Sequence, residues 1–237
     1  MQASQRSDKG LTFVYDPPKE PYLSILYKDD DIVVVDKPSG ILSVPGRYPE
    51  TNDSILTRVR ETSPGSAAVH RLDMSTSGIL VIARNSRAAS FLGKEFIGRT
   101  VVKRYVAWVY GRMENTDGEI DLPIGTSRDM SPLHFVDHEH GKEARTIYHT
   151  AAVLDDRSLV ILKPMTGRSH QLRLHLYSIS HPILGDAWYE NGKNTAMAPH
   201  LQLHAFYLKF RHPSGKTLEF LTCPPFDCPC SLVDYRA

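Results

Sequence analysis

The sequence lacks a hydrophobic run long enough to cross a bilayer. The longest unbroken aliphatic stretch, Ile79–Ala83, is far shorter than the roughly 20 apolar residues that a spanning helix needs. The opening residues 1–10 are polar and lack the apolar core of a secretory signal. We therefore expect a protein of the cytoplasm that associates with no membrane.

Cysteine is also scarce. The 3 cysteines, Cys223, Cys228 and Cys230, all lie near the carboxyl end, so no disulfide framework can hold the body of the chain together. This distribution fits a reducing compartment. Together with His212 the cysteines could form a zinc site, but their spacing is irregular, and the chain has neither an HExxH motif nor a pair of Cys-x-x-Cys units. We expect no metal.

Neither positive nor negative charge is in clear excess: the chain has 28 Lys and Arg and 27 Asp and Glu, which gives a formal net charge of +1. Bulk electrostatics therefore identifies no partner, and any affinity for nucleic acid must come from a local patch. The GxxxxGK[ST], GxGxxG and GxSxG motifs are all missing. Their absence disfavours nucleotide hydrolysis, dinucleotide chemistry and α/β-hydrolase chemistry.

What is present is an ordinary globular composition, with 41% hydrophobic and 23% charged residues in a chain of 237 residues. That length suits one main domain with a real core. Residues 1–20 are polar and contain Pro17 and Pro18, so they read as an N-terminal arm with one short strand at 11–15. We expect the catalytic domain to span 21–237.

Apolar periodicity in this domain predicts many short strands and few helices. The expected strands are 32–35, 79–84, 103–110, 144–154, 158–163, 201–210 and 218–221, with a further one near 188–189. The expected helices are 51–60, 86–99 and 169–180. Because strands and helices do not alternate steadily, the pattern favours an α+β fold over a doubly wound sheet.

A first polar cluster, His70, Arg71 and Asp73, stands just before the strand at 79–84 and is followed by small residues at 74–78. Small residues let another backbone approach the Asp73 carboxylate, and Arg71 can hold an anionic ligand. The alternative is a turn aspartate that accepts backbone N–H bonds. No partner carboxylate stands out, so the two-acid device of most glycosidases is not visible.

A second cluster opens the helix at 169–180 with Arg168, His170, Gln171 and Arg173. The arginines could meet phosphates or pair with Asp73, although a solvated helix face would look similar. The apolar stripe that we expect on this helix consists of Leu172, Leu176 and Ile179.

A third, basic cluster surrounds Tyr105 and consists of Lys94, Arg99, Lys103 and Arg104. Basic side chains beside an aromatic ring can bind a flipped or single-stranded base. The alternative is a strand tyrosine that faces the core.

Taken together and in order, these clusters resemble the motifs of the RluA-type pseudouridine synthases. The similar segments are His-Arg-Leu-Asp at 70–73, Thr-Ser-Gly at 76–78, Lys-Arg-Tyr at 103–105, Gly-Arg-Ser-His-Gln-Leu-Arg at 167–173 and His-Pro-Ile-Leu-Gly-Asp at 181–186. Weaker similarity covers nearly the whole chain. The resemblance implies an α+β domain with a mixed, mainly antiparallel sheet, flanking helices and a central RNA-binding cleft.

The resemblance also implies a reaction in which a uridine of RNA loses its N1–C1′ bond, the uracil turns, and C5 is rejoined to C1′, without a cofactor. Carried over by position, Asp73 is the catalytic aspartate, Tyr105 lies beside the target base and Arg173 is the ion-pair partner of Asp73. Arg71 would fill the space that the extruded nucleotide leaves. The residues expected to contact RNA are His70, Arg71, Lys103, Arg104, Arg168, His170 and Gln171.

Residues 1–24 are too short for the S4-like module that the family often carries. Segments 42–47 and 196–199 look like the RluA branch, which modifies both a tRNA anticodon stem-loop and large-subunit ribosomal RNA. We therefore expect structured RNA as the partner of a monomer. A non-catalytic RNA-binding module with the same fold, and a zinc-dependent hydrolase, are the competing hypotheses.

Overall fold

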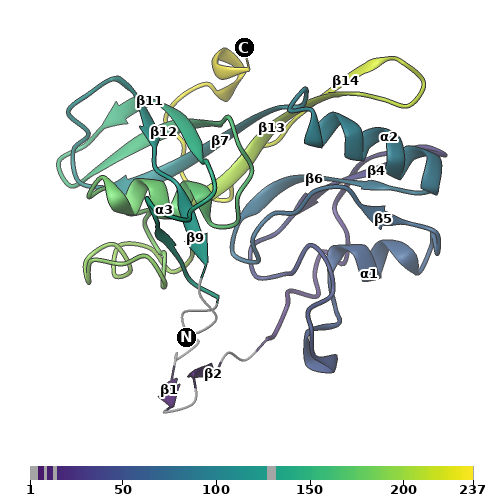
Figure 1. Ribbon diagram of the computed structural model, residues 1–237, viewed down its shortest axis with the longest axis horizontal. Coiled ribbons are helices and arrows are strands. Elements are labelled where there is room, and N and C mark those ends of the chain that lie inside the picture. Colours follow the sequence, from purple (N-terminus) through teal and green to yellow (C-terminus); the bar gives the residue numbers. More distant parts are fainter. Residues whose placement is uncertain (1–4, 8–9, 13–14, 127–131, 237) are drawn as a thin grey trace.

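The computed structural model describes residues 5–7, 10–12, 15–126 and 132–236. Its main feature is a ten-stranded sheet (Figure 1). The strands are β1 (Gln5–Ser7), β2 (Gly10–Thr12), β3 (Ile25–Lys28), β4 (Ile32–Lys37), β5 (Ala67–Ala68), β6 (Ser77–Ala83), β7 (Val102–Tyr110), β8 (Asp117–Asp121), β9 (Ile124–Thr126), β10 (His134–Val136), β11 (Arg145–Val153), β12 (Arg157–Pro164), β13 (Leu203–Arg211) and β14 (Thr217–Leu221). The helices are α1 (Ile55–Arg60), α2 (Ser86–Ile97) and α3 (Gln171–Ser178), with 3-10 turns η1 (Pro49–Thr51) and η2 (Leu232–Tyr235).

The main sheet runs in the order β3-β4-β6-β13-β7-β12-β11-β8, with β14 beside β13 and β5 beside β6. Its described pairs are antiparallel except for β13 and β6, which are parallel. The expected mixed, mainly antiparallel α+β sheet is therefore confirmed. Strands β9 and β10 form a separate ribbon.

The parallel pairing of β6 and β13 is the seam that joins the two halves of the sheet. Gly78 makes this close approach possible, because its φ is +114° and an added Cβ would lie 2.3 Å from the carbonyl oxygen of Ala205. The small residues after Asp73 thus admit a second backbone, as the sequence predicts.

In the first half, strands β4 and β6 are buried on both faces. Helix α1 covers one face with Ile55, Leu56 and Val59, and helix α2 covers the other with Ala88 and Leu92 (Figure 1). The Ser54 and Asn85 side chains cap the two helices by accepting backbone N–H bonds. Both strands are continuous runs of β-branched and aliphatic residues, as two-sided burial requires.

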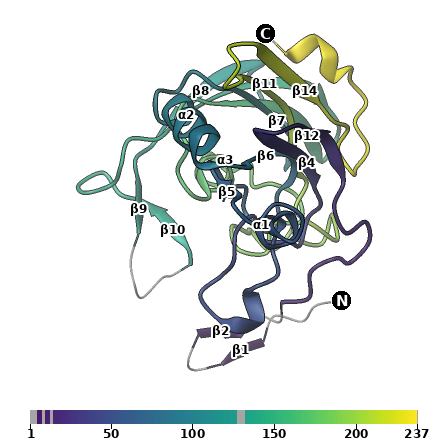
Figure 2. The ribbon, with the colours of Figure 1, turned by 90° about the vertical axis from the view of Figure 1, so that its right-hand side faces the viewer.

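In the second half, α3 lies on β7 and β12, where Leu172 and Leu176 join Val109 and Leu162 in one core with Ile179 packed against it. The predicted apolar stripe is confirmed. The β9–β10 ribbon stands beyond α3, and Figure 2 shows it set apart from the first half of the sheet.

Two predicted elements differ in the structure. The strand expected near 188–189 is wrong: the backbone bends there, because the Asp186 carboxylate accepts N–H bonds from both Trp188 and Tyr189 at 2.9 and 3.1 Å. The helix expected from residue 51 begins at Ile55, after the Ser54 cap. Of the strand expected at 11–15, β2 covers 10–12 and residues 13–14 lie outside the described part.

Candidate active site

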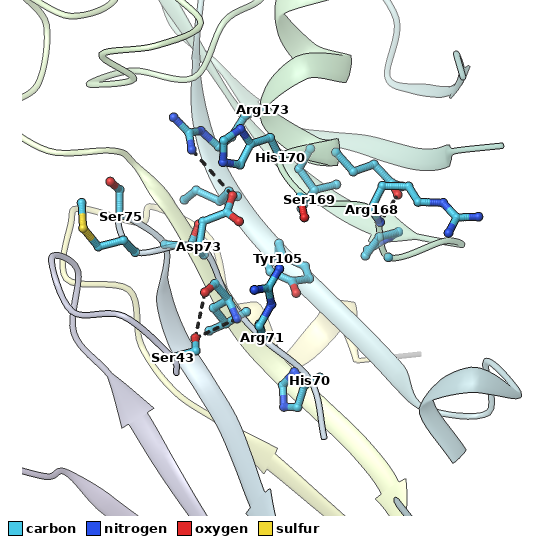
Figure 3. A pocket seen from close by; sticks show the side chains of 18 of the residues that line it. Ser43, His70, Arg71, Asp73, Ser75, Tyr105, Arg168, Ser169, His170 and Arg173 are labelled. Atoms are coloured by element: carbon cyan, nitrogen blue, oxygen red, sulfur yellow. Dashed lines mark hydrogen bonds and ion pairs between the residues drawn. The ribbon is translucent and has the colours of Figure 1, made fainter. Parts of the chain in front are cut away.

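A large open cleft, of about 2940 Å³, crosses the molecule at the seam. One wall comes from the loop before β6 and from the loop after β4, and the other comes from α3 and the β9–β10 ribbon. Strand β7 lies between them. The cleft brings together Asp73, Tyr105 and Arg173, which are far apart in the sequence (Figure 3).

The loop that carries Asp73 is held on both sides by the loop that follows β4. On the amino side, the Ser43 hydroxyl donates to the Leu72 carbonyl at 2.8 Å and accepts from the Leu72 N–H at 3.0 Å (Figure 3). On the carboxyl side, the Lys37 ammonium and the Gly40 N–H both donate to the Met74 carbonyl at 2.9 Å. The backbone of Asp73 is therefore fixed before any ligand binds.

The Asp73 side chain is 27% exposed, and its Oδ2 lies 3.6 Å from Nη1 of Arg173. Throughout the described part of the chain, no backbone N–H donates to this carboxylate, so the turn-aspartate alternative has no support in the structure. Figure 3 shows the carboxylate directed across the cleft toward Arg173. The sequence-predicted ion pair is present, as a single, rather long contact.

Arg173 forms its bidentate ion pair with Asp186 instead. Arg173 Nε and Nη2 each donate to an Asp186 carboxylate oxygen at 2.7 Å, and the Asp186 side chain is fully buried. The rings of Trp188 and Tyr189 lie 5.0 and 5.3 Å from the guanidinium carbon. Burial acts to lower the pKa of Arg173, but the Asp186 and Asp73 carboxylates outweigh it and raise the pKa.

Tyr105 lies on β7 near Asp73 and lines the cleft (Figure 3). It is partly buried and packs against both halves of the core. Burial, together with the nearby Asp73 carboxylate, raises the pKa of its phenol. The ring therefore remains protonated near neutrality and offers an aromatic face beside Asp73.

All seven residues predicted to contact RNA line the cleft: His70, Arg71, Lys103, Arg104, Arg168, His170 and Gln171. Arg71 and Arg168 are exposed. Burial, aided by Arg99, lowers the pKa of Lys103. The His170 imidazole bonds the Tyr189 hydroxyl at 3.0 Å, and burial lowers its pKa to about 4, so this ring is neutral at pH 7.

Arg104 lines the cleft too, but its side chain lies on the other face of β7. Side chains alternate along a strand, so Arg104 shares the face of Val106 and Trp108, away from Tyr105. It is 5% exposed and donates to the Lys103 carbonyl at 3.0 Å. Its guanidinium helps to line a small hollow of about 210 Å³ behind the sheet.

Gln171 lines the cleft, and both ends of its side-chain amide bond protein groups. The side-chain oxygen accepts from the Thr166 hydroxyl at 2.7 Å and from the Arg168 N–H at 3.0 Å. The nitrogen donates to the Arg145 carbonyl and the Thr146 hydroxyl at 2.9 and 3.0 Å. Gln171 is buried and joins the start of α3 to β11.

The His70 side chain also contacts other protein groups. Its Nε2 accepts a bond from the Val81 N–H at 3.0 Å, and its ring stacks on Phe96 with centroids 4.4 Å apart. Burial, with the charge of Lys103, lowers its pKa to about 3. The neutral imidazole supports the wall of the cleft.

Sequence reasoning assigned no role to Asp186 or Lys37. Asp186 ends the motif at 181–186, which is the signal that could have identified it. Lys37 is fully buried, donates to three carbonyls, and has its pKa lowered by burial to about 7. Only the three-dimensional arrangement reveals that its ammonium holds the Asp73 loop.

The described residues offer no metal site, in that no group of three or more His, Cys, Asp or Glu side chains could hold an ion. His212 bonds Ser214 and pairs with Asp29 at 3.1 Å, apart from the three free cysteines. Among the same residues, no helix has both the length and the apolar character that crossing a membrane requires.

Comparison with known proteins agrees with this geometry. A family model described as RNA pseudouridylate synthase matches residues 31–178. The chain is 47% identical over 208 residues to the dual-specificity RNA pseudouridine synthase RluA of Escherichia coli K12, covering 87% of this chain and 95% of that protein. It is 44% identical over 215 residues to the protein of the same name from Vibrio vulnificus, covering 89% and 86%.

Among solved structures, human RNA pseudouridylate synthase domain containing 1 is similar, with a TM-score of 0.70 and 30% identity. The match covers 91% of this chain and 86% of the human chain. The chain therefore belongs to the RNA pseudouridylate synthase family, and within it to the RluA-type enzymes.

Proposed function

We propose that this RluA-type RNA pseudouridine synthase isomerises uridines in structured RNA with Asp73 as its reacting group. The observation that carries the proposal is the partly exposed Asp73 carboxylate, 3.6 Å from a buried arginine and beside an aromatic ring in an open cleft. An everted uridine fits between these three side chains, because the cleft is open to solvent above them. Eversion costs a few kcal/mol, which contacts in the cleft must offset.

The Asp73 oxygen can act in two ways on the bound nucleoside. It can attack C1′, displacing uracil through N1, or it can take the 2′ proton while the same N1–C1′ bond breaks. In either case the electron pair of the broken bond leaves with the uracil, which turns so that C5 faces C1′. In the first route C5 then attacks C1′ and the Asp73–C1′ bond breaks; in the second, C5 bonds C1′ as C2′ takes its proton back from Asp73. C5 finally loses its proton and N1 gains one, so the product is an isomer of the substrate and no co-reactant is consumed.

Arg173 supports this chemistry by position. Its guanidinium is already fixed by Asp186, Trp188 and Tyr189, so it does not have to be ordered when RNA binds. One nitrogen, Nη1, remains directed at Asp73. The arginine then orients the carboxylate and balances its charge without neutralising it by a close bidentate contact.

Tyr105 supplies a flat face for the uracil, since base–aromatic stacking tolerates rotation of the base about the stacking axis. We assign Arg71, Lys103 and Arg168 to contacts with the RNA, where they line the cleft. Arg71 would fill the space that the everted nucleotide leaves. His70, His170 and Gln171 support the walls of the cleft through their hydrogen bonds to Val81, Tyr189 and Arg145.

The substrates that we propose are a tRNA anticodon stem-loop and large-subunit ribosomal RNA, on the model of the dual-specificity relatives. We further propose that the chain acts as a monomer in the cytoplasm. The scarcity of cysteine supports this compartment, since the chain has only Cys223, Cys228 and Cys230.

The test is a pseudouridine map of total RNA from cells with and without this chain, complemented by the wild type or by Asp73→Asn. We expect sites in tRNA and large-subunit rRNA to disappear without the chain and to return only with the wild type. Unchanged maps in its absence would contradict the proposal. Restoration by Asp73→Asn would favour the alternative in which the chain only binds RNA.

A further inference from the structure

Tyr48 is an exposed aromatic residue at the mouth of the cleft. Its residue is 63% exposed, the largest exposed fraction among the tyrosines in the described part of the chain. Arg47 beside it is exposed as well, and both line the same cleft as Asp73. The ring is therefore accessible to a ligand that enters the cleft.

The loop that presents Tyr48 is ordered by its own hydrogen bonds. The Gly46 N–H donates to the Thr51 carbonyl at 2.8 Å, and the Thr51 N–H and hydroxyl both donate to the Tyr48 carbonyl, at 2.9 and 2.8 Å. Pro49 begins the turn η1, where its fixed φ favours one backbone conformation. The ring is therefore displayed on a preformed support, which lowers the entropy that binding must overcome.

The same loop is joined to the Asp73 loop through Ser43. The Ser43 hydroxyl exchanges two hydrogen bonds with the Leu72 backbone, directly before Asp73 (Figure 3). The far end of the loop is anchored where the Ile55 and Leu56 N–H groups donate to the Leu42 and Ser43 carbonyls. Tyr48 thus holds a fixed position relative to the reacting carboxylate, although it lies outside the Asp73–Arg173–Tyr105 group.

Three chemical features of this position select a ligand. An exposed tyrosine ring stacks well on any nucleobase, because every base has a π face. An adjacent arginine suits the phosphate of the same strand. Because the loop lines the same cleft as Asp73, it is within reach of an RNA whose uridine enters that cleft.

We propose that Tyr48 is a stacking platform for an unpaired base of the substrate RNA, outside the catalytic pocket, and that Arg47 meets a neighbouring phosphate. The inference rests on the proposed action on structured RNA and adds a second point of contact. Holding a neighbouring base in this way offsets part of the cost of opening the RNA around the target. Tyr48 is then a binding residue that favours substrates with an unpaired loop.

The test measures binding of unmodified tRNA transcripts to the full chain carrying Asp73→Asn, so that the RNA does not change during the titration. Tyr48→Ala should weaken binding between about 5-fold and about 100-fold, with an unchanged salt dependence, because stacking releases no counterions. Tyr48→Phe should bind like the parent. Arg47→Gln should reduce the salt slope by about 1.

Leu154→Ala is the matched control, because Leu154 is 43% exposed near the β11–β12 turn and does not line the cleft. Tyr48→Ala binding as tightly as the parent would overturn the proposal, as would equal weakening by Tyr48→Phe or Leu154→Ala. The wild type is assayed for pseudouridine in the same transcripts. An active wild type with unaffected Tyr48→Ala binding refutes the platform alone, whereas an inactive wild type that binds none of the transcripts refutes the proposed function and the platform with it.

Discussion

Two carboxylates share Arg173, and the structure treats them differently. Asp186 is fully buried and accepts two hydrogen bonds from the guanidinium at 2.7 Å. Asp73 is 27% exposed and makes one contact at 3.6 Å. Asp186 also accepts the Trp188 and Tyr189 N–H groups, while the described chain gives Asp73 no backbone donor.

This difference indicates that one carboxylate fixes the arginine and the other is available for reaction. A buried carboxylate that accepts four hydrogen bonds, as Asp186 does, is a poor nucleophile or base, because bonds must break before it reacts. Asp186 therefore fixes the arginine, and Asp73 retains free oxygens that face the cleft. The arginine links a rigid support to a reactive group without binding the reactive group tightly.

The variant Asp73→Asn tests the proposed difference between Asp73 and Asp186 most sharply, and we expect it to have the largest effect. The amide is a poor nucleophile and base, so pseudouridine formation should be abolished, while the melting temperature and RNA affinity stay close to those of the wild type. Nucleoside analysis of a uridine-containing tRNA after incubation measures the first, and calorimetry and a binding titration measure the others. Measurable turnover by the variant would refute the catalytic assignment.

Asp186→Asn should reduce both activity and stability. It leaves a buried arginine without its main counter-charge, and breaking one partner of a buried pair costs about 3–5 kcal/mol. Arg173→Lys should act similarly, because lysine lacks the planar fork. Urea unfolding at pH 7 checks the stability. If Asp186→Asn unfolds like the wild type, Asp186 does not hold the arginine as we infer.

The stability of the folded chain should depend on pH through His204, which lies at the seam between β6 and β13. This buried ring bonds Ser77 and Thr222 at 2.9 Å each, and burial lowers its pKa to about 4. The unfolded chain binds a proton here near pH 6.5 and the folded chain does not, so stability is present above that pH and is lost as the pH falls toward 4. The contribution lost between pH 6.5 and 5 is about 2 kcal/mol.

The comparison that tests this is the difference in unfolding free energy between pH 7 and pH 5 for the wild type and for His204→Gln. The glutamine does not titrate, so the variant should lose less stability over that range. Equal losses in both proteins would show that His204 titrates alike in the folded and unfolded chains.

The smallest expected effect distinguishes the two faces of β7. Lys103 shares the Tyr105 face of β7, whereas the Arg104 side chain lies on the opposite face and is buried although the residue lines the cleft. Lys103→Gln should therefore lower the salt slope of RNA binding by about 1 and Arg104→Gln should not. Titrations at several salt concentrations measure both slopes. Equal slopes for the two variants would contradict the assignment of faces.

The sequence predicts the fold well where periodicity is strong. The β-branched runs of β4 and β6 and the alternation of β7 give strands near their observed bounds, and the three-to-four spacing of α2 and α3 gives helices. The strand expected at Trp188 fails because a side-chain carboxylate, Asp186, competes for the backbone N–H groups. Local pattern does not reveal that competition.

The site is predictable only in part for a similar reason. Motif resemblance brings Asp73, Tyr105 and Arg173 to one cleft, because those motifs carry spatial information. It does not say which neighbour holds the arginine, so Asp186 is missed, and it treats Lys103 and Arg104 alike. Burial and strand direction decide these cases, and both depend on contacts with distant segments.

The most direct test of the central claim is a structure of Asp73→Asn bound to an uncleaved, uridine-containing tRNA stem-loop. We predict an everted uridine with its base on the Tyr105 ring and its C1′ or 2′ position about 3–3.5 Å from the substituted side chain at position 73, a distance suited to reaction. Arg173 should remain paired with Asp186. A target uridine held elsewhere in the cleft, away from position 73, would contradict the account.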